Sequence, residues 1–113
     1  MSDNNFTVQP TELTIQPIEL FKVLSDPTRL KLFQILFQKQ ARCVGELVEM
    51  LEQPQPTISR HLNHLKKLGI LNAVREGTWM WYEMSDDLPD WCQNILQTTY
   101  QALSEQQDIM SDQ

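Results

Sequence analysis

The 113-residue sequence has few of the residues on which several protein classes depend. Its two cysteines, Cys43 and Cys92, are too few for a disulfide-stabilised fold, which favours a reducing cytoplasm. Three glycines leave no phosphate-cradling loop, and no Ser/His/Asp or HExxH arrangement is evident, so an enzyme is the least favoured class. No apolar run has the length of a membrane span, and the N-terminus lacks the basic and apolar regions of a signal peptide. The sequence therefore predicts one small cytoplasmic domain with no membrane partner.

Positive charge is confined to the middle of the chain. The formal net charge is −6, yet all nine Lys and Arg residues lie between Lys22 and Arg75, together with only four acidic residues. Contacts with phosphate depend on the field at the contact surface, not on the charge of the whole molecule. The acidic total therefore does not exclude nucleic acid as a partner.

The first half of the chain predicts two helices after a flexible, polar arm over residues 1–14. Apolar residues keep helical spacing from Ile15 to Leu24. In "SDPTRL", Asp26 is a good N-cap and Pro27 suits the first helical position, so a second helix is expected there, followed by a polar connector, "QKQAR". Its expected inward residues are Leu30, Phe33 and Phe37.

The next segment predicts a helix-turn-helix. Val44, Leu47, Val48 and Leu51 have the spacing of a short amphipathic helix, which "EQPQP" ends. Pro56 is expected to begin the following helix and to keep Gln55 outside it. The apolar residues of that helix are Ile58, Leu62, Leu65 and Leu68, and Gly69 supplies its end. The second helix of such a pair enters the major groove of DNA.

The rest of the sequence completes a winged helix. "ILNAVREGTWMWYEM" is typical of a β-hairpin with its turn at Glu76–Gly77, and "SDDLPDW" opens a last helix. We therefore expect a mainly α fold with a β-hairpin wing, a folded domain over residues 15–104 and a frayed polar tail over residues 105–113.

The apolar side of the last helix predicts a homodimer. It is longer than so small a core can cover, and helix-turn-helix proteins commonly pair to read two half-sites. The fold is thus expected to dimerise through its terminal helices, with an interface formed by Ile18, Phe21, Leu88, Trp91, Cys92, Ile95, Leu96 and Thr99.

Contacts with double-stranded DNA are expected from the second helix of the pair and from the wing. Arginine suits guanine, glutamine suits adenine, and Ser or Thr suits base edges or phosphate. The candidate residues are Gln55, Thr57, Ser59, Arg60, His61, Lys66, Lys67, Arg75, Gly77 and Thr78.

Simpler structural interpretations apply to some of these residues. The helix face and its lysines could be no more than solvated surface. His61 is more simply a residue that packs or hydrogen-bonds inside the helix-turn-helix, with His64 exposed. The aromatic run from Trp79 to Tyr82 more simply covers the core than stacks on bases.

Three stretches of the sequence resemble the ArsR/SmtB-type winged-helix repressors, which release DNA when they bind a metal or metalloid. These are "LSDPTRLKLFQIL", "CVGELVEMLEQPQPTISRHLNHLKKLGIL" and "VREGTWMWYEMSDDLPDWCQNIL", roughly three quarters of the chain. The wing and last helix are most similar to the arsenical-resistance branch. The resemblance implies a cytoplasmic homodimer that represses its own operon, with trivalent arsenic as inducer and no cofactor required for folding.

The sequence departs from that branch in its thiols. Cys43 matches the sensing cysteine, but Gly45 stands where a second thiol would be and Val48 near a third, so no trigonal thiolate set exists within this helix. The zinc-type site of the last helix is unsupported, because no histidine lies between Asp86 and Gln113.

Cys43 and Cys92 are therefore the candidate metalloid ligands, Cys43 because a helix N-terminus favours its thiolate. Cys92 could instead pack at the dimer interface or pair with Cys43 of the same or the other chain. Two rival functions stay open: a thiol redox-sensing repressor that oxidises Cys43 and Cys92, and a winged-helix protein-interaction module without an operator.

Overall fold

A computed structural model describes residues 15–111, with the side chains of residues 15–106. The predicted arm over residues 1–14 lies outside the described residues. Within them the chain forms a winged helix-turn-helix, as the sequence predicts. Its elements in order are α1 (Pro17–Leu24), α2 (Pro27–Leu36), β1 (Arg42–Cys43), α3 (Val44–Leu51), α4 (Gln55–Lys67), β2 (Leu71–Glu76), β3 (Trp79–Met84) and α5 (Asp90–Ser111).

The first two helices are separated by a sharp break at Ser25 and Asp26. The Asp26 carboxylate accepts the backbone N–H of Arg29 at 3.0 Å, and Pro27 occupies the first turn, so the predicted N-cap of α2 is confirmed. In α1, Leu20 and Val23 are buried, whereas Ile18 and Phe21 are exposed. One side of α1 therefore packs in the protomer and the other remains uncovered.

The helix-turn-helix is formed by α3 and α4, and α4 begins one residue earlier than predicted. Pro54 is the N-cap, and Gln55 is already helical. Proline at the second helical position, Pro56, costs no hydrogen bond, because the first N–H groups of a helix have no partner within it. The expectation that Gln55 stays outside the helix is therefore wrong.

The C-terminus of α4 joins the wing through a Schellman motif. The N–H of Gly69 donates to the carbonyl of Lys66, and the N–H of Ile70 donates to that of Leu65, both at 3.0 Å. Gly69 has a φ of +82°, which an L residue rarely adopts. Strand β2 begins two positions later, at Leu71. The predicted helix end is confirmed, and it leaves almost no linker between α4 and the wing.

The wing is part of a three-stranded antiparallel sheet with strand order β1-β3-β2. Glu76 pairs with Trp79, so the hairpin turn consists of Gly77, with a φ of +64°, and Thr78, one residue later than predicted. The last residue of the segment predicted to be a polar connector, Arg42, forms β1 together with Cys43, and these two residues pair with Tyr82 and Trp81 of β3. Two residues are too few for an alternating pattern, so the sequence alone does not reveal this strand.

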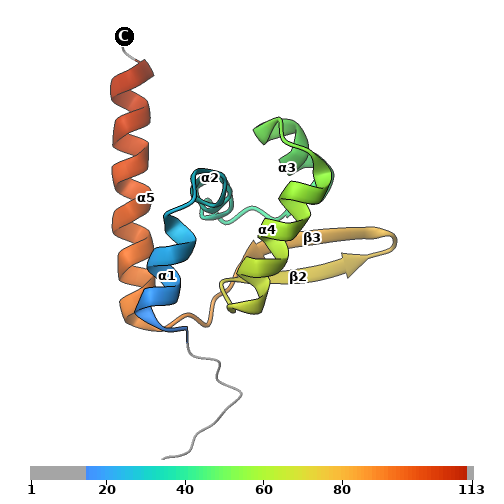
Figure 1. Cartoon of the computed structure of the whole chain (residues 1–113), viewed down its shortest axis with the longest axis horizontal. Helices are drawn as coiled ribbons and strands as arrows, with labels where there is room; N and C mark the ends of the chain where they lie inside the picture. The colour runs from blue at the N-terminus through green and yellow to red at the C-terminus, as the bar shows by residue number, and fades with distance from the viewer. Residues whose placement is uncertain (1–14, 112–113) are drawn as a thin grey trace, which may run out of the picture.

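The long helix α5 lies beside α1, and the hairpin projects on the far side of the molecule (Figure 1). Leu88, Cys92 and Leu96 are buried in the core of the protomer itself, and the Tyr100 ring packs against Phe37 with centroids 4.9 Å apart. The backbone stays helical to Ser111, beyond the predicted end of the domain at residue 104. Residues 105–107, Glu and Gln, favour helix without needing an apolar face.

None of the helices in the described part of the chain is long and apolar enough to cross a membrane.

Replacing Gly69 with alanine should destabilise the fold by about 1 kcal/mol, because the penalty of the positive φ falls on any side chain there. No atom lies within 4 Å of an added Cβ, so steric clash adds nothing. Gly45→Ala is the matched control: its Cβ also meets open space but its φ is not positive, so a gain of up to about 1 kcal/mol is expected. Urea unfolding followed by far-UV circular dichroism measures both, and equal effects would contradict the conformational explanation.

Candidate nucleic-acid interface

The outward face of α4 carries most of the predicted DNA contacts. Gln55, Arg60, Lys66 and Lys67 are exposed, while Thr57 and Ser59 are half-buried. Asn63, which the sequence analysis did not single out, is exposed three positions after Arg60 and so lies on the same face. Helical spacing from Arg60 is the signal that could have found it. The face therefore combines cationic groups with amides that can read base edges.

The opposite face of α4 is fixed in the core. Ile58, Leu62 and Leu65 are fully or almost fully buried, as their helical spacing predicts. A side-chain hydrogen bond fixes the preceding turn, because Gln53 Nε2 donates to Thr28 Oγ1 of α2 at 2.9 Å. The outward side chains are thus presented by a rigid support.

His61 lies inside the helix-turn-helix, not on the outward face. Its Nε2 is 3.9 Å from a carboxylate oxygen of Asp26, and its Nδ1 is 3.4 Å from the Arg29 guanidinium. The structural interpretation of His61 therefore describes its position, and its predicted contact with DNA is not supported, because the ring is turned to the start of α2. His64 is exposed, as expected.

The electrostatics of this contact favour a neutral His61. Burial lowers the pKa of the imidazole, an effect that the Asp26 carboxylate opposes and the Arg29 charge reinforces. The backbone N–H of Arg29 lowers the pKa of Asp26. Arg29 also donates from Nε to the Val23 carbonyl at 3.0 Å and from the other end of its guanidinium to the Lys22 carbonyl at 3.2 Å.

The wing presents Arg75, Gly77 and Thr78 at and near its tip, all exposed. The aromatic run that follows is divided between core and surface. Tyr82 is buried and Met80 packs against the core, but Trp79 is 59% exposed and Trp81 lies half-buried on the same face of β3, so the expectation that the run covers the core is wrong for these two tryptophans. The reason for Trp79 is its position next to the hairpin turn, at the projecting end of the sheet (Figure 1).

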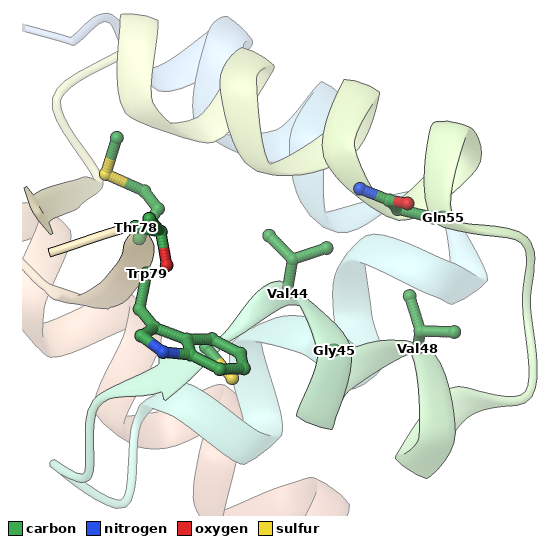
Figure 2. A pocket seen from close by; sticks show the side chains of 8 residues that line it. Val44, Gly45, Val48, Gln55, Thr78 and Trp79 are labelled. Atoms are coloured by element: carbon green, nitrogen blue, oxygen red, sulfur yellow. The ribbon is translucent and has the colours of Figure 1, made fainter. Parts of the chain in front are cut away.

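A cavity of about 390 Å³ separates the wing from the two helices of the motif. Thr78 and Trp79 form its wing side, Gln55 lies at the start of α4, and Val44 and Val48 stand between them on α3 (Figure 2). Cys43, the N-cap of α3, also lines it and is 6% exposed. The sensing thiol predicted by the family resemblance thus borders the same space as the DNA-facing residues.

The structure does not bring the two cysteines into one accessible site. Cys92 has no exposed surface, and burial raises the pKa of its thiol, which favours the protonated form. In the part of the chain that is described, no three His, Cys, Asp or Glu side chains are arranged to hold a metal ion. Cys92 is therefore a core residue of the protomer, and its burial gives no support to the prediction that it is a ligand.

The residues predicted for the dimer interface fall into two groups. Ile18 and Phe21 are 64% and 53% exposed, and Trp91, Ile95 and Thr99 are half-buried, so all five have surface to offer a partner. Three others have little or no surface to offer a second copy, because they are buried in the protomer: Leu88, Cys92 and Leu96. Apolar residues at helical spacing in the sequence do not show which of them pack in the protomer's own core and which contact a second copy.

Comparisons with known proteins identify the family. The model described as "Bacterial regulatory protein, arsR family" matches residues 26–73. The arsenic resistance transcriptional regulator ArsR2 of Pseudomonas putida is 41% identical over 80% of this chain and 79% of its own length. The arsenical resistance operon repressor of Escherichia coli is 38% identical over 79% of this chain and 76% of its own. The chain belongs to the ArsR family.

A solved structure supports the same conclusion. The transcriptional repressor BigR from Xylella fastidiosa has a TM-score of 0.63 and 28% identity, with coverage of 75% of this chain and 83% of that one. As an ArsR-family protein, the chain is a DNA-binding transcriptional regulator and not an enzyme.

The position of His61 generates a pH-dependence for folding. Because its pKa is lower in the folded state than its ordinary value of 6.5, the unfolded chain binds protons more readily. The stability contributed by neutral His61 is complete above about pH 7 and falls as the pH drops below 6.5. The lowered pKa of Asp26 also contributes stability, which is complete above its ordinary pKa of 3.8 and is lost as the pH falls below that value.

We therefore expect the urea midpoint of the protein to be lower at pH 5.5 than at pH 7.5, and His61→Gln to reduce that difference. His64→Gln is the matched control, since His64 is exposed and is the smallest of the contributors to the lowered pKa of His61, so it should change the difference less than His61→Gln does. An unchanged pH-dependence in His61→Gln would show that other groups carry the effect.

Proposed function

We propose that this protein is a cytoplasmic homodimeric repressor that binds operator DNA through α4 and the wing and is released by trivalent arsenic. The observation that carries the DNA-binding part is the division of α4 into a buried apolar face and an exposed basic and amide face. The names of the Pseudomonas putida and Escherichia coli relatives support arsenic as the inducer.

DNA binding follows from how the exposed groups are arranged. Gln55, Arg60 and Asn63 project from the part of α4 that enters a major groove in helix-turn-helix proteins. Arg75 and Thr78 extend the surface onto the wing, where they suit the phosphate backbone. Nearby lysines, Lys66 and Lys67, add electrostatic attraction that depends on salt.

A homodimer is supported by the uncovered apolar surface of α1. Ile18 and Phe21 are each more than half exposed, on the helix that lies beside α5 (Figure 1). Trp91 and Ile95 of α5 retain exposed surface as well. Burying four such side chains in a second copy would remove apolar area from water, and two copies would place two α4 helices on successive half-sites.

The inducer is proposed to act at Cys43. A thiolate binds soft metalloids, and Cys43 is the N-cap of α3 and lines the cavity between the wing and the helix-turn-helix. Arsenous acid would form an As–S bond to Cys43 and lose one hydroxyl, which leaves as water with the thiol proton, and the arsenic would then enter the space bordered by Gln55 and Thr78. It would thereby favour a different spacing of α4 and the wing, and a coupling of about 1–3 kcal/mol is typical of such linkage.

The redox alternative receives less support. A disulfide between Cys43 and Cys92 needs a thiolate to attack, and Cys92 is completely buried with a raised pKa. The structure gives Cys92 a packing role that requires no chemistry. Cys43 therefore carries the sensing proposal alone.

The DNA-binding proposal predicts that Arg60→Ala weakens binding to the upstream DNA about tenfold or more, the loss typical of a removed base or phosphate contact. Lys66→Ala should weaken it less and reduce the salt slope by about 1. Lys31→Ala, an exposed cation on α2, is the control and should have little effect. Fluorescence anisotropy across a salt series measures all three, and absence of binding at low salt would favour the interaction-module alternative.

The sensing proposal predicts that trivalent arsenic, under reducing conditions, releases the wild-type protein from DNA. Cys43→Ser should bind DNA normally and ignore arsenic, because it lacks the thiolate. Cys92→Ala should keep the response, which separates the two thiols. Release by an oxidant but not by arsenic would instead support the redox alternative, and the same anisotropy assay distinguishes them.

A further inference from the structure

The wing sheet has an outer face that is not part of the core, and two of its residues, Cys43 and Trp79, also line the cavity between the wing and the helix-turn-helix. In an antiparallel pair, residues directly opposite each other project from the same face. Trp81 is opposite both Cys43 and Val74, and Trp79 is opposite Glu76. Tyr82, on the other face of β3, is buried in the core, so the two tryptophans belong to the outer face.

Two adjacent hollows lie on this outer face, and Trp81 lines both. The first, about 450 Å³, is formed by residues of the β1–α3 junction and β3: Cys43, Gly45, Glu46, Glu49, Trp79 and Trp81. The second, about 360 Å³, is formed by Ala41, Val74, Glu76, Trp81 and Glu83. We refer to the two together as the outer wing groove. Each hollow is within the size range of small-molecule sites.

The outer wing groove has negative charge and no positive charge. Each hollow contains two glutamates, and neither is lined by Lys or Arg. Among the described residues, none of the four carboxylates has a Lys or Arg nitrogen within 4.0 Å; Glu46 accepts only the backbone N–H of Cys43, at 3.1 Å. Arg42 and Arg75 pair with Tyr82 and Met80 and therefore project from the opposite face of the sheet.

This combination excludes DNA and favours a cation. Carboxylates repel phosphate, so the groove is not an extension of the nucleic-acid interface. Indole rings attract cations over their faces, most strongly among the aromatic side chains, and uncompensated carboxylates nearby add to that attraction. Trp79 is more than half exposed and so can present its ring to a ligand.

We propose that the outer wing groove binds a small organic cation, such as a quaternary or protonated amine, between the tryptophan rings and the glutamates. The assignment rests on charge complementarity and on the size of the hollows. It does not depend on the identity of the operator or of the inducer.

The test is a titration of the full-length, ¹⁵N-labelled protein with benzyltrimethylammonium, followed by the indole N–H signals in two-dimensional NMR. We expect saturable shifts for Trp79 and Trp81. Trp91, which lies on α5 outside the groove, is an internal control and should not shift. Benzyl alcohol, which has the same ring without the charge, should bind at least tenfold more weakly.

Two variants separate the aromatic from the electrostatic contribution. Trp79→Leu should weaken binding of the cation at least fivefold, and because Trp79 is more than half exposed the substitution removes little packing from the fold. Glu49→Gln should weaken it at least twofold, whereas Glu105→Gln, an exposed carboxylate on α5, should leave it unchanged.

Several outcomes would overturn the proposal. One is that benzyl alcohol binds as tightly as benzyltrimethylammonium, and another is that Glu105→Gln weakens binding as much as Glu49→Gln does. The others are shifts confined to Trp91 and absence of saturation by about 10 mM, roughly ten times a Kd of 1 mM. Binding of a lysine-rich peptide without binding of the small cation would make the groove a protein-docking surface and would also reject the proposed ligand class.

Discussion

The Arg29 guanidinium is the contact on which the placement of the DNA-facing helix depends. It donates to the Val23 and Lys22 carbonyls near the end of α1 and lies 3.4 Å from the His61 ring of α4. The Lys22 and Val23 carbonyls also accept the backbone N–H groups of Ser25 and Asp26, so the planar guanidinium adds a second bond to each and also reaches a third helix. The C-terminal end of α1, the start of α2 and the recognition helix α4 are therefore joined by one polar cluster around Arg29, Asp26 and His61.

The second constraint is that Cys43 serves two elements at once. It pairs with Trp81 as part of β1 and is the N-cap of α3. A change at its sulfur therefore bears on the sheet and on the helix-turn-helix together. The cavity beside it includes Gln55 and Thr78, one from each DNA-facing element. A single thiol at this position therefore contacts the sheet, the helix-turn-helix and the cavity between them without a preformed cluster of ligands.

Much of the architecture could be predicted because its determinants are local. Asp26 and Pro27 start α2, and the buried residues of α4 recur at helical spacing, so neither depends on distant partners. The errors arose where a residue's environment is set by contacts far away in sequence. The strand at Arg42 exists only because β3 lies beside it, and Trp79 is exposed only because the hairpin projects from the molecule.

The candidate site shows the same division. Exposed residues of α4 were predictable from the apolar stripe on its other side. The burial of Cys92 in its own protomer was not predictable in the same way. An apolar stripe on a terminal helix indicates that a residue is buried, but not whether it packs in its own protomer or against a second copy, and the structure places Cys92 in its own core. His61 likewise required the position of Asp26 to be known before its orientation could be decided.

The Schellman turn at Gly69 has a mechanical consequence. Since β2 starts immediately after the turn that closes α4, the helix and the hairpin have no hinge between them. The hairpin is six residues long on each strand, an arm of about 20 Å at about 3.3 Å per residue. A rotation of α4 by about 10° would then displace the wing tip by about 3 Å, roughly the length of one hydrogen bond. A small tilt of α4 in the major groove of DNA thus becomes a larger displacement of the wing at the phosphate backbone. The contacts of α4 with the bases and of the wing with the backbone are therefore made or lost together.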